Sequence, residues 1–232
     1  MPKSSHVSSL RRTALIIGSG LLALSGLPEM SCDLGGAAFA QIPIPPESAL
    51  TLGYDLGVGS VQASVARGNP GDMSPQSARK LAAASIADAA AIAGGLNGTA
   101  NIGVDLSHDA DSIAQGLSSG PPDAAYVGGL YDRIVALRAS HTASFGKLDA
   151  RVLNIYAMGV SLGLAEAQST QGAAARPLVS TALDEASYYA GQAGLTKQPI
   201  DAASLKLNTG NSLDEVHTMI VSARGFYVSA LH

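Results

Sequence analysis

The sequence predicts an all-α protein, a bundle of about six main helices, and three observations support this fold class. Of the 232 residues, 47% are hydrophobic, 14% charged and only 4% aromatic, which is too apolar for a disordered chain. Alanine dominates this apolar content, and alanine is the strongest helix former because it loses no side-chain entropy on folding. Apolar residues also recur at spacings of three and four, and no segment alternates with period two as a half-buried strand would.

The first forty residues are typical of a cleavable secretory signal. Lys3 and Arg11-Arg12 make a basic beginning, and an uncharged apolar stretch follows from Thr13 to Leu27. Ala38-Phe39-Ala40 then has the small residues of a signal peptidase site. Because the apolar stretch is shorter than the roughly 20 residues of a spanning helix, we expect cleavage after Ala40 and an extracytoplasmic location, periplasmic or secreted. An uncleaved N-terminal anchor stays open as the alternative.

Cys32 is the only cysteine of the chain. Its place just after the apolar stretch makes lipid attachment an alternative, although the preceding Glu29-Met30-Ser31 fits a lipidation motif poorly. Release after Ala40 would remove Cys32 and leave residues 41–232 without a thiol. Disulfides, thiolate metal sites and cysteine nucleophiles are then excluded.

The charge of residues 41–232 argues against polyanionic partners. This part carries 11 basic and 16 acidic side chains, a net charge of −5. It has no Lys/Arg block interleaved with aromatic residues, so we expect no nucleic-acid binding. It has no polybasic segment for anionic lipids either. We treat residues 41–232 as a single all-α domain without a membrane span.

The first half of this domain contains three main predicted helices. The first begins near Glu47 and ends at the breaker cluster 68–72. The second begins at Ser74-Pro75, a residue pair favoured at helix N-termini, and ends near Gly94-Gly95. Residues 97–120 are the least regular, with one short helix expected around 111–117. Pro121-Pro122-Asp123 opens the third main helix.

Three more helices are predicted in the second half. After a break near 141–146, the longest helix covers about 147–168, and the next runs from about Arg176 to Ala193, where Gly194 ends it. A loop is expected over 196–211. The last helix has the clearest beginning, because Ser212 and Glu215 form a capping box.

A faint internal repeat relates the two halves. Tyr54-x-x-Gly57-Val58 recurs as Tyr156-x-x-Gly159-Val160, and Ala78-Arg79-x-Leu81 recurs as Ala175-Arg176-x-Leu178. We therefore predict a duplicated three-helix unit over about 47–140 and 147–231, with chance similarity between Ala-rich helices as the alternative. Arg79 and Arg176 are expected at the surface or paired with carboxylates.

Glycines inside helices need a compensating benefit, since each costs about 1 kcal/mol relative to alanine. For Gly57, Gly59, Gly159 and Gly163 we expect close contact between helices, and the alternative is room for a ligand. Four side chains are the candidate ligand-binding residues, two tyrosines at matching repeat positions and two carboxylates in the following helices: Tyr54, Asp88, Tyr156 and Glu185. Other isolated helical carboxylates are Asp55, Asp132, Glu166 and Asp184.

Motifs for catalysis are missing from the sequence. No two histidines lie three or four residues apart, and no nucleophile elbow or phosphate-binding loop occurs. We expect no cofactor and no metal. The densest polar segment, Asp105 to Asp111 with His108, lacks the spacing of a calcium loop and is expected to cap and solvate a helix.

The leading hypothesis is an exported, non-catalytic binding or interaction module of the cell envelope. Its partner would be a protein, an envelope component or a small apolar ligand. Two alternatives stay open. One is a metal-dependent or carboxylate-based enzyme that uses the segment 105–111, and the other is a structural subunit that self-associates through its small-residue faces.

Overall fold

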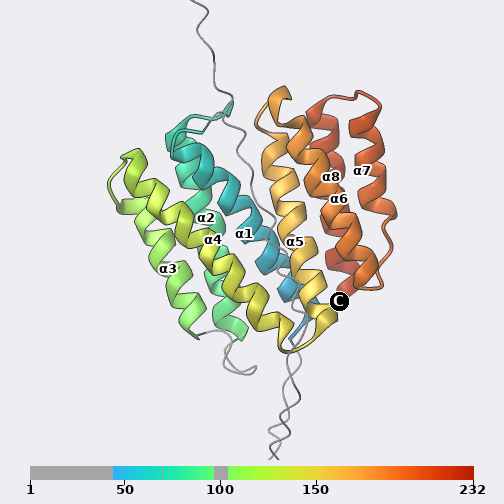
Figure 1. The fold of residues 1–232 in the computed structure, drawn as a ribbon, viewed down its shortest axis with the longest axis horizontal. Helices are drawn as coiled ribbons and strands as arrows, with labels where there is room; N and C mark the ends of the chain where they lie inside the picture. Colours follow the sequence, from blue (N-terminus) through green and yellow to red (C-terminus); the bar gives the residue numbers. More distant parts are fainter. Residues whose placement is uncertain (1–43, 70, 97–103) are drawn as a thin grey trace, which may run out of the picture. The chain divides into compact units, whose positions relative to one another are not determined.

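The computed structural model describes residues 44–69, 71–96 and 104–232, without the side chains of residues 104 and 105. These residues form eight α-helices and no strand, so the all-α prediction is confirmed (Figure 1). The predicted signal segment 1–40 and Cys32 lie outside the described residues. The helices are α1 (Pro46–Ala66), α2 (Pro75–Gly95), α3 (Val104–Ser119), α4 (Ala124–Gly146), α5 (Ala150–Ser169), α6 (Arg176–Gln192), α7 (Gln198–Asn208) and α8 (Leu213–Leu231), with a 3₁₀ turn η2 (Ala173–Ala175) before α6.

Three expectations about helix extent were wrong. The expected loop 196–211 contains α7, whose buried Ile200, Ala203 and Leu207 recur at spacings of three and four. Such a stripe is short in an eleven-residue helix, and tertiary packing rather than propensity stabilises it. The irregular segment before residue 120 is mostly α3. The expected break at 141–146 is helical, because buried His141 and Phe145 continue the stripe of Leu137 along α4.

Predicted helix ends are confirmed where a side chain makes the cap. The Ser74 and Ser212 hydroxyls accept hydrogen bonds from the backbone N–H groups of Ser77 and Glu215, at 3.2 Å in both cases. Asp123 caps α4 in the same way, at 2.8 Å from the N–H of Tyr126. These bonds satisfy donors that a helix N-terminus leaves free.

The crossing of α1 and α5 is the closest helix contact, and glycines make it possible. At four glycines, two on each helix, an added Cβ would overlap a backbone carbonyl oxygen of the other helix. The close packing predicted for Gly57, Gly159 and Gly163 is therefore confirmed, and Gly59 instead packs against the Ile86 side chain of α2. The four pairs of glycine and carbonyl are Gly53 with Tyr156, Gly57 with Val160, Gly159 with Leu50, and Gly163 with Tyr54.

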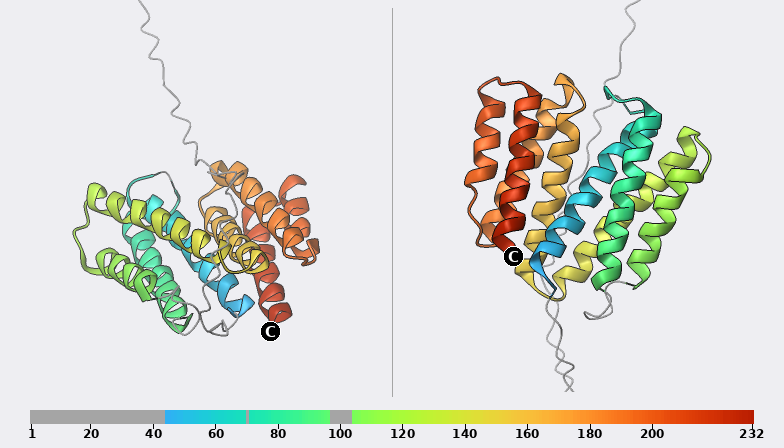
Figure 2. Two further views of the ribbon diagram at one scale, coloured as in Figure 1. Left: turned by 60° about the horizontal axis from the view of Figure 1, so that its bottom comes forward. Right: turned by 180° about the vertical axis from the view of Figure 1, so that it is seen from behind.

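The remaining helices surround this crossing in two matching sets. In the first set, α2 packs on α1 and α3, and α4 packs on α1, α3 and α5. In the second set, α6 packs on α5 and α7, and α8 packs on α5, α7 and α1. The back view in Figure 2 shows α1 running between α8 and α2. Each predicted repeat thus contains four helices rather than three, with 47–140 ending inside α4. That the two sets are copies of one unit stays a prediction.

Arg79 and Arg176, at matching positions of the predicted repeat, make matching contacts. The Arg79 guanidinium donates to the carbonyls of Gly116, Leu117 and Gly120 at the end of α3. Arg176 donates to the carbonyls of Leu207 and Asn211 at the end of α7, at 2.8 and 2.6 Å. Both arginines therefore neutralise the partial negative charge of a helix C-terminus. The expected pairing with carboxylates was wrong for these contacts.

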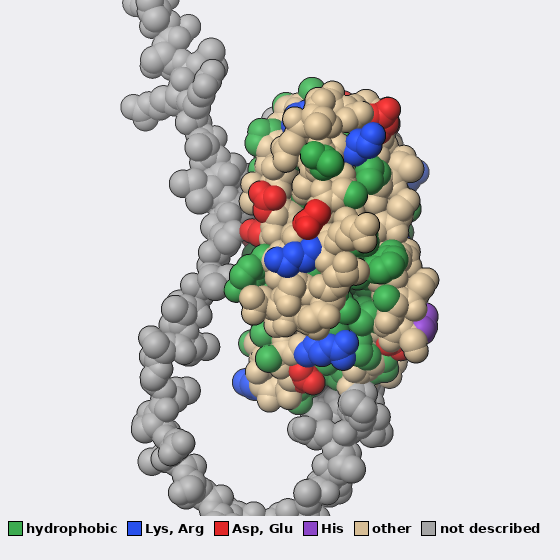
Figure 3. Space-filling view, turned by 90° about the vertical axis from the view of Figure 1, so that its right-hand side faces the viewer, with side chains coloured by type: hydrophobic (Ala, Val, Ile, Leu, Met, Phe, Trp, Pro, Cys, Tyr) green, Lys and Arg blue, Asp and Glu red, His purple; other side chains and the backbone are tan. Residues whose placement is uncertain are grey.

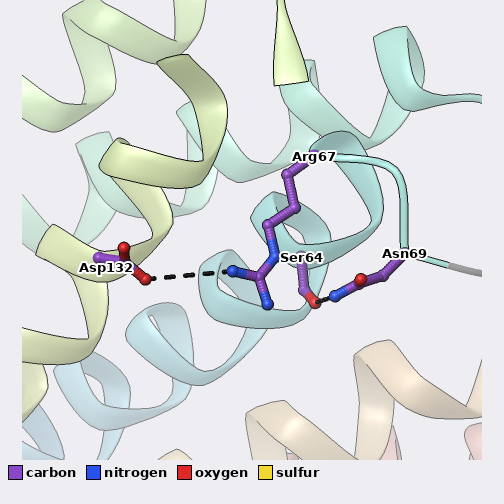
Figure 4. A network of polar contacts seen from close by, with 4 residues as sticks. All are labelled: Ser64, Arg67, Asn69 and Asp132. Carbon is purple, nitrogen blue, oxygen red and sulfur yellow. Dashed lines mark hydrogen bonds and ion pairs between the residues drawn. The ribbon is translucent and has the colours of Figure 1, made fainter. Parts of the chain in front are cut away.

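A surface network connects the end of α1 to α4 (Figure 4). Arg67 lies 4.0 Å from the carboxylate of Asp132 and 3.9 Å from the centre of the Tyr131 ring. Asn69 hydrogen bonds to Ser64 at 2.5 Å and holds the turn after α1. Because the Asp132 side chain is 78% exposed, the ion pair contributes less than about 1 kcal/mol.

Candidate functional site

The four candidate ligand-binding residues lie among two different sets of partners. Tyr156 is fully buried against His141 and Phe145, with ring centroids 6.0 and 5.0 Å away. Its hydroxyl donates to the backbone carbonyl of Arg138 at 3.2 Å. Glu185 of α6 accepts a hydrogen bond from Ser161 of α5 at 3.4 Å. Tyr156 therefore has the surroundings of a core residue.

Tyr54 and Asp88 have a different neighbourhood, which centres on Asp55. The guanidinium of Arg224 in α8 lies 3.9 Å from the centre of the Tyr54 ring. The charges of Arg224, Asp88 and Glu166, from three other helices, act on Asp55. We call Tyr54, Asp55, Glu166 and Arg224 the Asp55 cluster, with the exposed Asp88 at its edge.

Three helices that pack on one another supply the side chains of the cluster. Tyr54 and Asp55 lie between the two glycines of α1 that contact α5, and Glu166 follows Gly163 by one turn of α5. Arg224 comes from α8, which packs on both central helices. Asp55 is only 8% exposed and Tyr54 only 5%.

Burial controls the electrostatics of this cluster. Loss of solvation raises the pKa of Asp55 from 3.8 to about 7; Arg224 opposes this shift, and Asp88 and Glu166 add to it. Burial, followed by the hydrogen bond and charge of Glu166, raises the pKa of Tyr54 above its ordinary value. Such shifts are common at functional sites because a site must often hold a group in an unfavourable environment.

Hydrogen bonding in the cluster is incomplete. Glu166 Oε2 is buried and has no hydrogen-bond partner among the described residues. Within the same part of the chain, Asp55 makes neither a hydrogen bond nor an ion pair. A buried carboxylate without a donor is costly, so the cluster is not explained by its contribution to stability.

The opposite face of the α1–α5 crossing provides a comparison within the same molecule. The contact glycines of α1 and α5 are 106 residues apart, since Gly53 corresponds to Gly159 and Gly57 to Gly163. By the same offset, Asp55 of α1 corresponds to Ser161 of α5, and Glu166 of α5 corresponds to Ser60 of α1. Both serines have partners, since Ser161 donates to Glu185 and Ser60 lies 3.4 Å from Arg138. At these positions the crossing has neutral hydroxyls, and their partners are the charged side chains of Glu185 and Arg138.

His141 is a second buried ionisable group that the sequence did not single out. It is 1% exposed, stacks on Phe145 at 5.9 Å, and neither ring nitrogen has a partner among the described residues. Burial lowers its pKa from 6.5 to about 4. A neutral imidazole in an aromatic environment is a packing residue here.

An open groove of about 430 Å³ lies between α6 and α7. Figure 3 views the face that carries α7, where hydrophobic side chains lie among charged ones. Tyr188 and Leu205 are 56% and 64% exposed at this groove. Charged and polar neighbours include Asp184, Lys197, Asp201 and Asn208.

The polar segment 105–111 lies on α3. The side chain of Asp105 is outside the described part, and His108, Asp109 and Asp111 are exposed to solvent. Asp109 lies 4.0 Å from Arg133 of α4. In the described part of the chain no three His, Cys, Asp or Glu side chains are grouped as metal ligands would be, and none of its helices combines the length and apolarity needed to cross a membrane.

The fold and the cluster together define an all-α helical bundle with one buried carboxyl group, that of Asp55, in its described part. Comparison of the chain with models of known protein families, with curated proteins and with solved structures gives no match. Function is therefore inferred from the site itself.

Proposed function

We propose that this protein is an exported, non-catalytic binding protein of the cell envelope whose ligand binds at the Asp55 cluster. The observation that carries the proposal is that Asp55 is buried without a hydrogen-bond or ion-pair partner among the described residues, and that the Oε2 atom of Glu166, on another helix, is buried without a partner. A buried hydrogen-bond acceptor without a donor destabilises the protein, and this cost is removed when a bound ligand supplies the donor. A polar ligand fits this site better than a small apolar ligand, which is one of the three kinds of partner that the sequence left open.

Export is supported by the sequence of the first forty residues, with its basic beginning, apolar stretch and small residues before Gln41. Mass spectrometry of the protein purified from its native host tests this part. We expect a chain that begins at Gln41. A chain that retains Cys32, with or without a lipid, would contradict the proposed cleavage.

Binding at the cluster is tested by a thermal-shift screen against a chemically diverse set of small molecules. Compounds that bind the native state raise its melting temperature by mass action. We expect at least one class of compound to stabilise the wild-type protein but not Asp55→Asn or Glu166→Gln. If no compound distinguishes the wild type from these variants, the cluster is not a binding site.

A carboxylate-based enzyme is the second candidate, and one observation favours it. Burial raises the pKa of Asp55 to about 7, so that it would be about half protonated at neutral pH, and paired carboxyl groups of this kind act as general acid and base in hydrolases. Incubation of the stabilising compound with the protein separates the two functions. A binding protein returns the compound unchanged, whereas an enzyme produces a new species by mass spectrometry.

Self-association is the third candidate, and the exposed Tyr188 and Leu205 of the α6–α7 groove favour it. Light scattering over a wide range of concentration tests it. A dimer that Leu205→Ser converts to a monomer would support this candidate, and a monomer at every concentration would remove it.

A further inference from the structure

The groove between α6 and α7 shares no residue with the Asp55 cluster and is a site of its own. Its volume of about 430 Å³ lies in the range of small-molecule sites. One face of each helix lines it, because the lining residues recur at spacings of three and four. The residues that matter here are Asp184, Ser187 and Tyr188 on α6 and Asp201, Leu205 and Asn208 on α7.

Two contacts hold the walls of the groove in place. The Ser187 hydroxyl of α6 donates to Asp201 Oδ1 of α7 at 2.7 Å. At the beginning of α7, the side chain of Lys197 packs on Gly191 of α6, where a Cβ would meet its Cε atom. In the described part of the chain neither Lys197 nor Asp201 makes an ion pair, and both are exposed. Their charged groups are therefore accessible to a ligand.

Tyr188 gives the groove an aromatic surface. It is 56% exposed, and the Tyr189 ring packs edge-on against it with the ring centroids 5.3 Å apart. Leu205 on the facing helix is 64% exposed. Covering these two side chains with an apolar surface is favourable, so a ligand of this groove gains from having one apolar face.

The other half of the bundle indicates that the fold does not require these side chains. Arg79 of α2 and Arg176 of α6 make matching contacts with the ends of α3 and α7. Equal steps along the two helices from these arginines relate the groove residues Asp184, Ser187 and Tyr188 to Ala87, Ala90 and Ala91. Helix α2 thus has three alanines where α6 has a carboxylate, a hydroxyl and an aromatic ring. The groove residues of α6 are best explained by what they bind.

The polar groups of the lining select the class of ligand. The Ser187 hydroxyl and the Asn208 amide both donate and accept hydrogen bonds, whereas the carboxylates of Asp184 and Asp201 accept them. Two carboxylates disfavour an anion, and the ammonium group of Lys197 disfavours a cation. A neutral ligand that carries several hydroxyl groups and one apolar face satisfies all of these groups.

We infer that the α6–α7 groove binds a saccharide, with the C–H face of one pyranose ring on Tyr188. The ring hydroxyls donate to Asp184 and Asp201, and Asn208 and Lys197 donate to the sugar oxygens. This inference does not rest on ligand binding at the Asp55 cluster. Because the groove is open, a free sugar and one ring of a longer glycan chain present the same chemistry to it.

Isothermal titration calorimetry with the purified protein tests this inference. The probes are three disaccharides, maltose, cellobiose and N,N′-diacetylchitobiose, and we expect at least one to bind saturably and more tightly than about 1 mM. Sorbitol is the control, since it has hydroxyl groups but no ring face, and it should bind at least about tenfold more weakly. The hexasaccharide of the best-bound series separates the two sources. Tighter binding of the longer chain supports a glycan, and equal binding supports a free sugar.

Variants locate the binding. Tyr188→Ala is expected to weaken disaccharide binding by about tenfold, whereas Tyr188→Phe, which keeps the ring, should stay within about threefold of the wild type. Asn208→Ala should weaken binding by about fivefold, the loss of a hydrogen bond. Phe226→Ala is the matched control, because Phe226 is an aromatic residue of α8 that is 46% exposed outside the groove. It should change the affinity by less than about twofold.

Several results would overturn the saccharide assignment. They are no saturable binding of any disaccharide, equal binding of sorbitol, and an equal loss in Phe226→Ala and Tyr188→Ala. If disaccharide binding is lost in Asp55→Asn but kept in Tyr188→Ala, the sugar occupies the Asp55 cluster, so the proposed function stands and this inference fails. If no disaccharide binds and Leu205→Ser converts a dimer to a monomer, the groove is an interface between two copies of the chain instead.

Discussion

The backbone carbonyl oxygen of Tyr54 occupies the space in which a Cβ on Gly163 would stand. The same relationship holds for the other three glycines of the α1–α5 crossing, so the two helices are packed backbone against backbone. Contacts of this kind bring Cα–H groups near carbonyl oxygens, which adds weak stabilisation.

Gly163→Ala should therefore destabilise the protein. The new methyl group meets a backbone atom that cannot rotate away, so the helices must separate, at a cost of about 1–3 kcal/mol. Urea unfolding followed by circular dichroism measures the change. Gly225→Ala is the matched control, because this α8 glycine has open space around it, and it should stabilise the protein by about 0.5–1 kcal/mol. Equal stability of the two variants would contradict the packing role of Gly163.

Arg79→Gln and Arg176→Gln should each lower the free energy of unfolding by about 1–3 kcal/mol, the range for hydrogen bonds from charged groups. Each substitution leaves backbone carbonyls at the end of α3 or α7 without their charged donor. Arg133→Gln is the control, since its ion pair is exposed and contributes less than about 1 kcal/mol. Chemical denaturation measures the free energy of unfolding of all three variants. If Arg133→Gln lowers it as much as Arg79→Gln and Arg176→Gln do, the capping role of these two arginines is contradicted.

Asp55→Asn should raise stability at neutral pH. The native state keeps a proton on Asp55 up to about pH 7, whereas the unfolded state releases it near 3.8. The wild type therefore loses stability as pH rises through this window, by an amount on the order of 2–4 kcal/mol. The variant has no titrating group at this position and does not lose this stability. The difference in free energy of unfolding between the variant and the wild type should therefore grow from pH 4 to 7 and then stay constant. An advantage independent of pH would contradict the raised pKa.

His141→Phe should protect the protein against acid. The folded-state pKa is about 4 and the ordinary value 6.5, so the unfolded state takes up a proton first and the wild type loses stability as pH falls from 6.5 to 4. Phenylalanine removes the titrating group and packs against Phe145 and Tyr156. Thermal unfolding across this pH range measures the effect, with the exposed His108→Gln as a control that should behave as the wild type. If His141→Phe loses stability at low pH as much as the wild type does, protonation of His141 is not the cause of the acid sensitivity.

A helix could be predicted from the sequence where the periodic pattern of apolar residues was long or where a capping residue marked the beginning of the helix. The helix from Pro75 and the one after Ser212 were both clear, because a local residue pair marks each beginning. Helix α7 was missed because eleven residues carry only three buried positions. The continuation of α4 through His141 was missed because a histidine does not count as apolar in a periodic pattern, although here it is buried.

The candidate site was predicted only in part. Tyr54 and Asp88 were singled out by the repeat, and the structure finds both at the Asp55 cluster. Asp55 and Glu166 were recognised as isolated helical carboxylates, but a single sequence does not tell which of them face inward. A sharper indication was available in Leu52 to Leu56, where Asp55 is the one charged residue among side chains that all prove buried. Arg224 joins them only through the packing of α8, which no local pattern encodes.

The matching sets of helices have a consequence for chain connectivity. The turn 147–149 joins α4 to α5, and α8 ends beside the beginning of α1, as both views in Figure 2 show. A circular permutant that links His232 to Ile44 by a few flexible residues, and opens between α4 and α5, would keep every packed helix pair. The order in which the two sets follow each other along the chain is thus interchangeable for this bundle.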